Sequence, residues 1–213
     1  LFNEYISLGI RPPPARTLFI DNTVESMDEI DRVICFSNFS RNTFIEDGWN
    51  GEIIDVVPIG VDSNYFRYRE RKIEDKIIFL FLGDLGIVKG LHNIIKAWKI
   101  LCQTQNIGRR AELHIVGRWV KVGTRAYRRY IEAMASNERS IRFSTSEYFR
   151  MPNIPYYEAS HIFVNPSLTA GMDKTNLEAM STGLPVITTH ESGAGDSILD
   201  GKNGFIGDNH DTG

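Results

Sequence analysis

From residue 76 onward, short continuous apolar runs alternate along the chain with apolar residues at helical spacing. Residues 77–82 form an uninterrupted apolar run, which is typical of a strand covered on both faces. Further strands are predicted at residues 113–116, 141–143, 162–164 and 186–188, and helices at residues 91–101 and 127–134. Strands that alternate with helices predict parallel βαβ units, and therefore an α/β fold with a doubly wound, Rossmann-like parallel sheet.

Residues 1–60 follow a different pattern. Three prolines at residues 12–14 exclude a helix interior there, because each ring fixes φ and removes a hydrogen-bond donor. An apolar run at residues 33–36 predicts a strand, followed by a helix that Ser37 or Ser40 caps and that ends after Glu46, near Gly48. A second apolar run, at residues 53–59, ends in a turn, and we place a domain junction at residues 60–68.

Composition and charge limit the classes of function that this chain can have. The chain of 213 residues has 27 acidic and 24 basic side chains and a net charge of −3, which argues against a nucleic-acid partner and requires a local site for any anionic ligand. Cys35 and Cys102 lie in separate apolar stretches, which predicts buried free thiols. No apolar run approaches the roughly 20 residues that cross a bilayer, so we expect no transmembrane anchor. The chain begins at Leu1 and stops in a polar stretch, so we expect a piece of a longer protein.

Two loops at predicted carboxyl ends of strands are candidates for ligand binding, because open α/β sheets bind ligands at that edge. The first loop, residues 83–90, is flanked by glycines and has Lys89 just before a helix, an arrangement that suits a diphosphate. It is not a P-loop, since Lys89 precedes its glycine. Taken alone, it is equally compatible with a tight turn that carries a solvated lysine.

The second loop leads into a helix that bears a carboxylate. In residues 165–187 a strand end is followed by a loop with Gly171, then by a short helix with Glu178. A carboxylate on the inner face of that helix can accept two hydrogen bonds from a ribose diol. The first turn of the helix, near residues 173–176, can offer its amides to a phosphate.

Residues 177–187, Leu-Glu-Ala-Met-Ser-Thr-Gly-Leu-Pro-Val-Ile, resemble the signature of retaining GT-B glycosyltransferases of family 4. Colinear similarity extends to residues 57–62, 89–90, 113–117 and 198–205. The resemblance implies that residues 1–60 are the end of an N-terminal acceptor domain plus the crossover, and that residues 61–213 are the nucleotide-sugar-binding domain, truncated at its C-terminus.

The resemblance also implies a function: a UDP- or GDP-linked sugar binds here, and its sugar is transferred with retention to a glycan or lipid-linked acceptor on the cytoplasmic side of a membrane. Lys89 would counter the diphosphate and Glu178 would hold the ribose. The implied donor-binding residues are Gly83, Lys89, Gly90, Gly117, Gly171, Asp173, Lys174, Thr175, Asn176, Leu177 and Glu178. No cofactor and no metal are implied, and the sequence has no Asp-x-Asp motif.

Two positions depart from the family pattern. Ala170 stands where the first of two paired glutamates is found, so a contact to the donor sugar is absent or comes from elsewhere, with Asp173 and Lys174 as candidates. Asp84 stands where an arginine is common. A carboxylate there repels a diphosphate unless it points away or pairs with Lys89.

Alternative functions stay open. The glycine-rich loop and histidine of the family's first domain are absent from these residues, so we expect this piece alone to be inactive. One alternative is a catalytically silent scaffold that kept the fold, and another is a sugar-nucleotide epimerase of GT-B architecture. Five basic residues with interleaved aromatics, Arg118, Lys121, Arg125, Arg128 and Arg129, form either a solvated helix face or a peripheral contact with anionic lipid or an acidic glycan.

Overall fold

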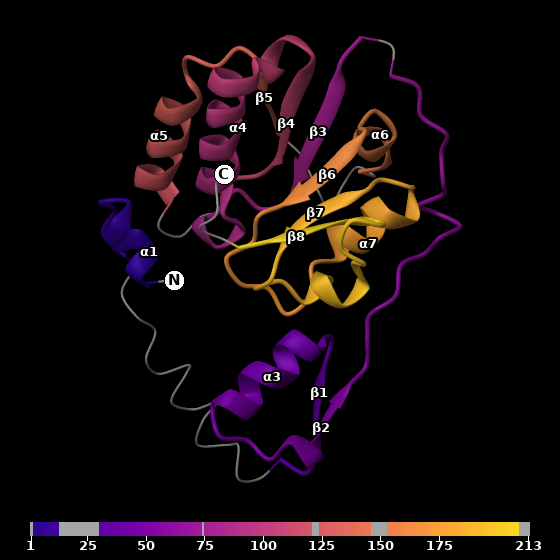
Figure 1. Cartoon of the computed structure of the whole chain (residues 1–213). Coiled ribbons are helices and arrows are strands. Elements are labelled where there is room, and N and C mark those ends of the chain that lie inside the picture. Colours follow the sequence, from indigo (N-terminus) through magenta and orange to yellow (C-terminus); the bar gives the residue numbers. More distant parts are fainter. Residues whose placement is uncertain (1, 13–29, 74, 121–123, 146–152, 209–213) are drawn as a thin grey trace.

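The computed structural model describes residues 2–12, 30–73, 75–120, 124–145 and 153–208. Its largest element is a six-stranded sheet in the order β5-β4-β3-β6-β7-β8, in which every neighbouring pair is parallel (Figure 1). The strands are β3 (Ile77–Leu82), β4 (Ala111–Gly117), β5 (Ile141–Thr145), β6 (Ile162–Asn165), β7 (Val186–Thr189) and β8 (Gly204–Gly207). The chain runs outward from β3 to β5, returns to β6 beside β3, and then runs outward the other way. The predicted doubly wound α/β fold is therefore confirmed.

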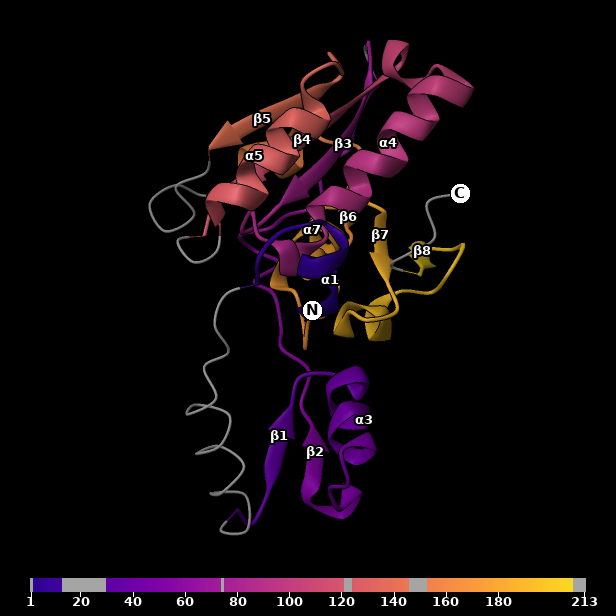
Figure 2. The same ribbon diagram turned by 90° about the vertical axis from the view of Figure 1, so that its left-hand side faces the viewer.

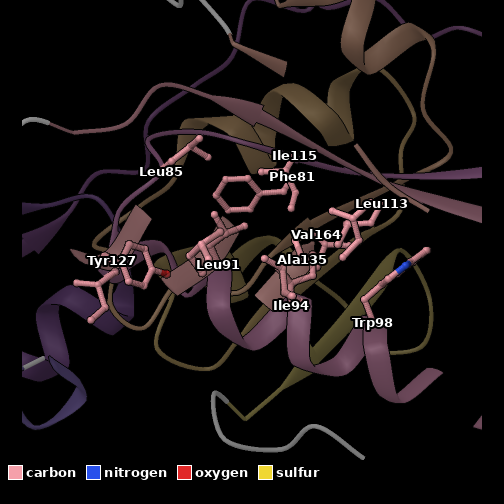
Figure 3. Packing of buried hydrophobic residues seen from close by; sticks show 14 of the residues in the cluster. Phe81, Leu85, Leu91, Ile94, Trp98, Leu113, Ile115, Tyr127, Ala135 and Val164 are labelled. Carbon is pink, nitrogen blue, oxygen red and sulfur yellow. The ribbon is translucent and has the colours of Figure 1, made fainter. Parts of the chain in front are cut away.

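Alternation along the strands places apolar side chains on both faces of this sheet. Phe81 of β3 belongs to one cluster, with α4 (Leu91–Gln105) and α5 (Thr124–Ala135). Its neighbours Leu80 and Leu82 belong to the other, with α6 (Ile154–Glu158) and α7 (Lys174–Ser181). Figure 1 shows the two pairs of helices on opposite faces, Figure 2 shows α4 and α5 together on the face toward the viewer, and Figure 3 shows how the first cluster packs.

A smaller unit precedes this sheet. β1 (Val33–Cys35) and β2 (Ile54–Val56) pair in parallel, and α3 (Asn38–Glu46) connects them together with the short 3₁₀ helix η2 (Gly51–Ile53). Ser37 caps α3 by accepting a hydrogen bond from the Ser40 backbone N–H at 3.1 Å, and Gly48 follows with a left-handed φ of 97°. The predicted strand, cap and helix end are confirmed.

Residues 2–12 pack on the large sheet. They include the helix α1 (Phe2–Ser7), where Tyr5 is buried in the cluster around α4 and α5. Glu4 Oε1 lies 2.7 Å from Nε2 of the buried His92 at the start of α4. The division into residues 1–60 and 61–213 remains a prediction, and α1 shows that part of the first segment contacts the second.

Two further sequence predictions concern thiols and membrane spans. Both cysteines are free, but only Cys35 is buried, whereas Cys102 is partly exposed. Among the described helices, none combines the length and the apolar character needed to cross a membrane.

Candidate functional site

The winding direction of the large sheet changes between β3 and β6, so the loops after these two strands diverge from one point at the carboxyl edge. Close backbone contacts hold the loops together. Gly90 has a left-handed φ of 62°, and a Cβ built on it would lie 1.8 Å from the Pro166 carbonyl oxygen. The Leu168 N–H donates to the Val88 carbonyl at 2.8 Å. A glycine after Lys89 is therefore required both by its own conformation and by its neighbour.

A cavity of about 360 Å³ opens at this switch point. Its volume lies within the range of small-molecule sites, roughly 300–1,000 Å³. Side chains from three strand ends and from the start of α7 line it: Phe81, Leu82, Gly83, Asp84, Lys89, Arg118, Asn165, Met172, Asp173, Lys174 and Thr175. Five of the predicted donor-binding residues, namely Gly83, Lys89, Asp173, Lys174 and Thr175, are thus brought together here.

Lys89 and Asp173 form an ion pair across the switch point, between Nζ and Oδ1. The other oxygen of Asp173 accepts hydrogen bonds from Asn165 Nδ2 at 2.7 Å and Ser167 Oγ at 2.8 Å. Asp173 is the N-cap residue of α7, but its side chain makes no capping bond to that helix. The carboxylate is committed to Lys89 and to the loop after β6 and not to the first turn of α7, where the Asn176 N–H donates to the Asp173 carbonyl at 3.1 Å.

Glu178 lies on α7 one helical turn after Lys174 and is 9% exposed. Its Oε2 accepts a hydrogen bond from the Tyr157 hydroxyl at 2.7 Å. Burial raises the pKa of Glu178, while the Tyr157 bond and the positive charge of Lys174 act in the opposite direction. Glu178 is not among the described residues that line the cavity, but it is carried by the helix whose N-terminus forms one wall.

The remaining predicted residues have structural contacts. A Cβ on Gly117 would lie 1.8 Å from the Gly83 carbonyl oxygen, so these two glycines allow the ends of β3 and β4 to touch. The Gly171 carbonyl accepts a hydrogen bond from Ser37 Oγ of the smaller unit. Asn176 is fully buried and accepts a hydrogen bond from Asn165, while Leu177 is partly buried.

The two departures from the family pattern now have structural contexts. Asp84 pairs with Arg118, whose Nε lies 3.2 Å from Oδ1, and not with Lys89. Both oxygens of Asp173 already accept hydrogen bonds, from Lys89, Asn165 and Ser167. Of the two candidates for the sugar contact, Lys174 therefore fits better: it is exposed and lines the cavity.

Sequence reasoning missed Arg118 and Tyr157 as parts of this site. The sequence pattern groups Arg118 with the basic residues that follow it, although its position directly after Gly117 at a strand end is a signal for the site. The other described members of that group, Arg125, Arg128 and Arg129, are exposed on α5, and Lys121 lies outside the described residues. Tyr157 lies on α6, 21 positions before Glu178, and no local pattern connects the two.

A second cavity, of about 520 Å³, lies at the amino edge of the sheet. It is lined by Arg71, Lys76, Glu112 and His161, among others. Although it is larger, it lies at the start of β3 and β4, where α/β sheets do not bind their ligands. Within the described residues, no group of three or more His, Cys, Asp or Glu side chains could hold a metal ion.

The fold and the cavity together define a doubly wound α/β domain with a cavity at the switch point of its sheet. The sequence model of the family described as "Glycosyl transferases group 1" matches residues 63–212. The chain therefore belongs to this family of glycosyltransferases.

Known proteins of similar sequence include named glycosyltransferases. The chain is 25% identical to the capsular polysaccharide biosynthesis glycosyltransferase CapM of Staphylococcus aureus, over 68% of this chain and 37% of CapM. It is 24% identical to the D-inositol 3-phosphate glycosyltransferase of Acidothermus cellulolyticus, over 98% of this chain and 49% of that enzyme. The chain thus spans half or less of the length of these relatives.

A solved structure supports the fold. Alr3699/HepE from Anabaena in complex with UDP matches with a TM-score of 0.72 and 20% identity, over 85% of this chain and 51% of that protein. At this identity, the likeness shows the shared architecture alone.

Proposed function

We propose that the cavity between β3 and β6 binds the nucleotide of a UDP-linked sugar, and that the complete protein transfers this sugar, with retention, to a glycan or lipid-linked acceptor on the cytoplasmic side of a membrane. The observation that carries the proposal is the Lys89–Asp173 pair across the switch point. It fixes a cation between a glycine loop and a helix N-terminus, where a diphosphate is stabilised by both.

Glu178 completes the proposed nucleotide site. Tyr157 holds Oε2, which leaves Oε1 to accept hydrogen bonds from the ribose hydroxyls. The ionised carboxylate accepts hydrogen bonds from the two hydroxyl groups more strongly than the neutral acid does. Because burial raises the pKa of Glu178, nucleotide binding should weaken as the pH falls through a value above the ordinary carboxyl range.

The choice of UDP rests on likeness. HepE, which shares the fold, has been crystallised with UDP, with UDP-glucose, and with UDP and glucose. The transfer chemistry would place developing negative charge on the leaving nucleotide, which Lys89 and the first turn of α7 can stabilise as preorganised groups. Ala170 leaves the contact to the sugar to another side chain, and Lys174 is the one that the cavity offers.

The test is calorimetric titration of this chain with UDP, and with GDP in parallel. We expect UDP to bind and Lys89→Gln to weaken it by about tenfold or more, because a charge-assisted contact to phosphate is lost. Glu178→Gln should weaken the binding of UDP and the binding of uridine to the same extent. Lys76→Gln is the matched control: Lys76 is similarly buried and paired with Glu112, but at the amino edge. Equal effects of Lys89→Gln and Lys76→Gln would reject the site, and GDP bound in preference to UDP would correct the base.

A further inference from the structure

Arg118 enters the cavity wall from the end of β4, beside the loop that carries Asp84. Backbone contacts fix its position. The Leu85 N–H donates to the Arg118 carbonyl at 2.8 Å, and Gly117 lies too close to Gly83 to accept a side chain. The guanidinium is therefore held on the same side of the cavity as Asp84, with Arg118 Nε 3.2 Å from Asp84 Oδ1.

Without Arg118, the positive and negative charges that line the cavity cancel. Lys89 is compensated by Asp173 through a largely buried ion pair, and the other two charged residues of the lining are Lys174 and Asp84, which have opposite signs. A nucleoside diphosphate carries at least two negative charges at neutral pH. Arg118 supplies the excess of positive charge that such a ligand requires, and a guanidinium matches the geometry of phosphate oxygens better than an ammonium does.

The Asp84–Arg118 pair itself contributes little to folding. Its side chains are 48% and 52% exposed, and ion pairs of that kind are weak because water and salt screen them. A weak pair is easily rearranged when an anion enters. Asp84 then orients the arginine toward the cavity without locking it, which also explains how an acid can stand near a diphosphate.

We propose that Arg118 is a second cation of the donor site, which binds the diphosphate together with Lys89 and is oriented by Asp84. This inference rests on the proposed function. It assigns Arg118 a different role from Arg128, an arginine of equal exposure that pairs with Glu132 and stacks on Trp119 outside the cavity.

The experiment compares Arg118→Gln with Arg128→Gln, which make the same change of charge on side chains of 52% and 53% exposure. Each variant is titrated with UDP and with uridine. We expect Arg118→Gln to weaken UDP binding by roughly five- to tenfold and to leave uridine binding unchanged, because a charge-assisted contact to phosphate is lost while the nucleoside contacts remain. Arg128→Gln should change neither.

A salt series supplies an independent readout. UDP binding by Arg118→Gln should depend less steeply on sodium chloride than binding by the unchanged chain, because fewer cations meet the diphosphate. Circular dichroism confirms that each variant is folded. If Arg118→Gln leaves UDP affinity and its salt dependence unaltered, or lowers uridine and UDP affinity equally, the inference is wrong while the donor site stands. If the unchanged chain binds neither UDP nor GDP, the proposed function itself fails.

Discussion

The six-stranded sheet and the smaller unit of β1, β2 and α3 both contain parallel strands and helices, but their side chains are buried to different extents. Ile115 of β4 is 0% exposed, whereas Ile34 of β1 is 64% exposed. Six residues of α4 are buried, and none of α3 is. An apolar run thus predicts a strand in both regions. The side chains of such a run form a buried core only where the sheet is covered on both faces. A core of this kind can hold the adjoining loops in a fixed geometry.

The comparison is tested most strongly by making one substitution in both regions. Ile115→Ala should lower the free energy of unfolding by about 3 kcal/mol, because it leaves a cavity in a fully packed layer. Ile34→Ala should change it by less than about 0.5 kcal/mol, since its side chain is already mostly in water. Urea unfolding followed by circular dichroism measures both. Similar losses for the two variants would show that β1 is buried in solution.

Glycine substitutions give the next largest expected effect. Gly90→Ala should lower the free energy of unfolding by about 2 kcal/mol, because it forces a left-handed residue to accept a side chain against Pro166. Gly60→Ala in the connecting segment should be nearly neutral, since a Cβ there meets none of the described atoms within 4 Å. Thermal unfolding of both variants is the measurement. A neutral Gly90→Ala would mean that the loop after β6 moves freely away from Lys89.

Much of the fold could be predicted because its signals are local. The run at residues 77–82 coincides with β3, and α4 begins at the predicted Leu91. The sequence does not predict the strand β8, because Gly204 and Gly207 weaken its apolar pattern. The helix α6 was missed because it has only five residues and Pro155 in its first turn.

The site could be predicted in part. Lys89 and the start of α7 were identified because each loop carries its own signal of glycine, charge and a helix start. Their pairing through Asp173 could not be predicted from the sequence, since it depends on how two chain segments 84 positions apart meet at the switch point. The same holds for Arg118 beside Asp84 and for Tyr157 beside Glu178.

The two regions are also expected to differ in how the pH affects their stability, because their ion pairs differ in burial and in number of partners. In the large sheet, Glu112 of β4 is bonded by His114, Lys76 and Arg142, which lower its pKa to about 2. The folded state thus favours the ionised carboxylate, so this stability is fully present above the unfolded pKa of roughly 4.3 and is lost as the pH falls toward 2. Glu112→Gln should cost about 1–2 kcal/mol at pH 7, discounted because Arg142 is exposed.

The control lies in the smaller unit. Asp55 of β2 pairs with Arg32, and both side chains are at least half exposed. Asp55→Asn should therefore change stability by a few tenths of a kcal/mol at most. Unfolding at a series of pH values should show the Glu112→Gln deficit narrowing below about pH 4. A deficit that stays constant with pH would contradict the lowered pKa of Glu112.

The smallest expected effect concerns the contact between the two regions. Ser37 is fully buried, caps α3 and donates to the Gly171 carbonyl, and the neighbouring Asn38 N–H donates to Asp196 of the 3₁₀ helix η5 (Gly193–Ser197). Ser37→Ala removes the cap and the bond together and should cost about 1 kcal/mol. Hydrogen exchange should become faster both at the first turn of α3 and at the loop around Gly171.

Asn50 provides the matched control, since it caps η2 by accepting from the Glu52 N–H within the smaller unit. Asn50→Ala should speed exchange at η2 and leave the loop around Gly171 unchanged. If Ser37→Ala speeds hydrogen exchange in α3 alone, the two regions do not stabilise one another at this contact. If it affects both, the smaller unit stabilises the loop that leads to Asp173, the partner of Lys89, and so contributes to the geometry of the proposed donor site.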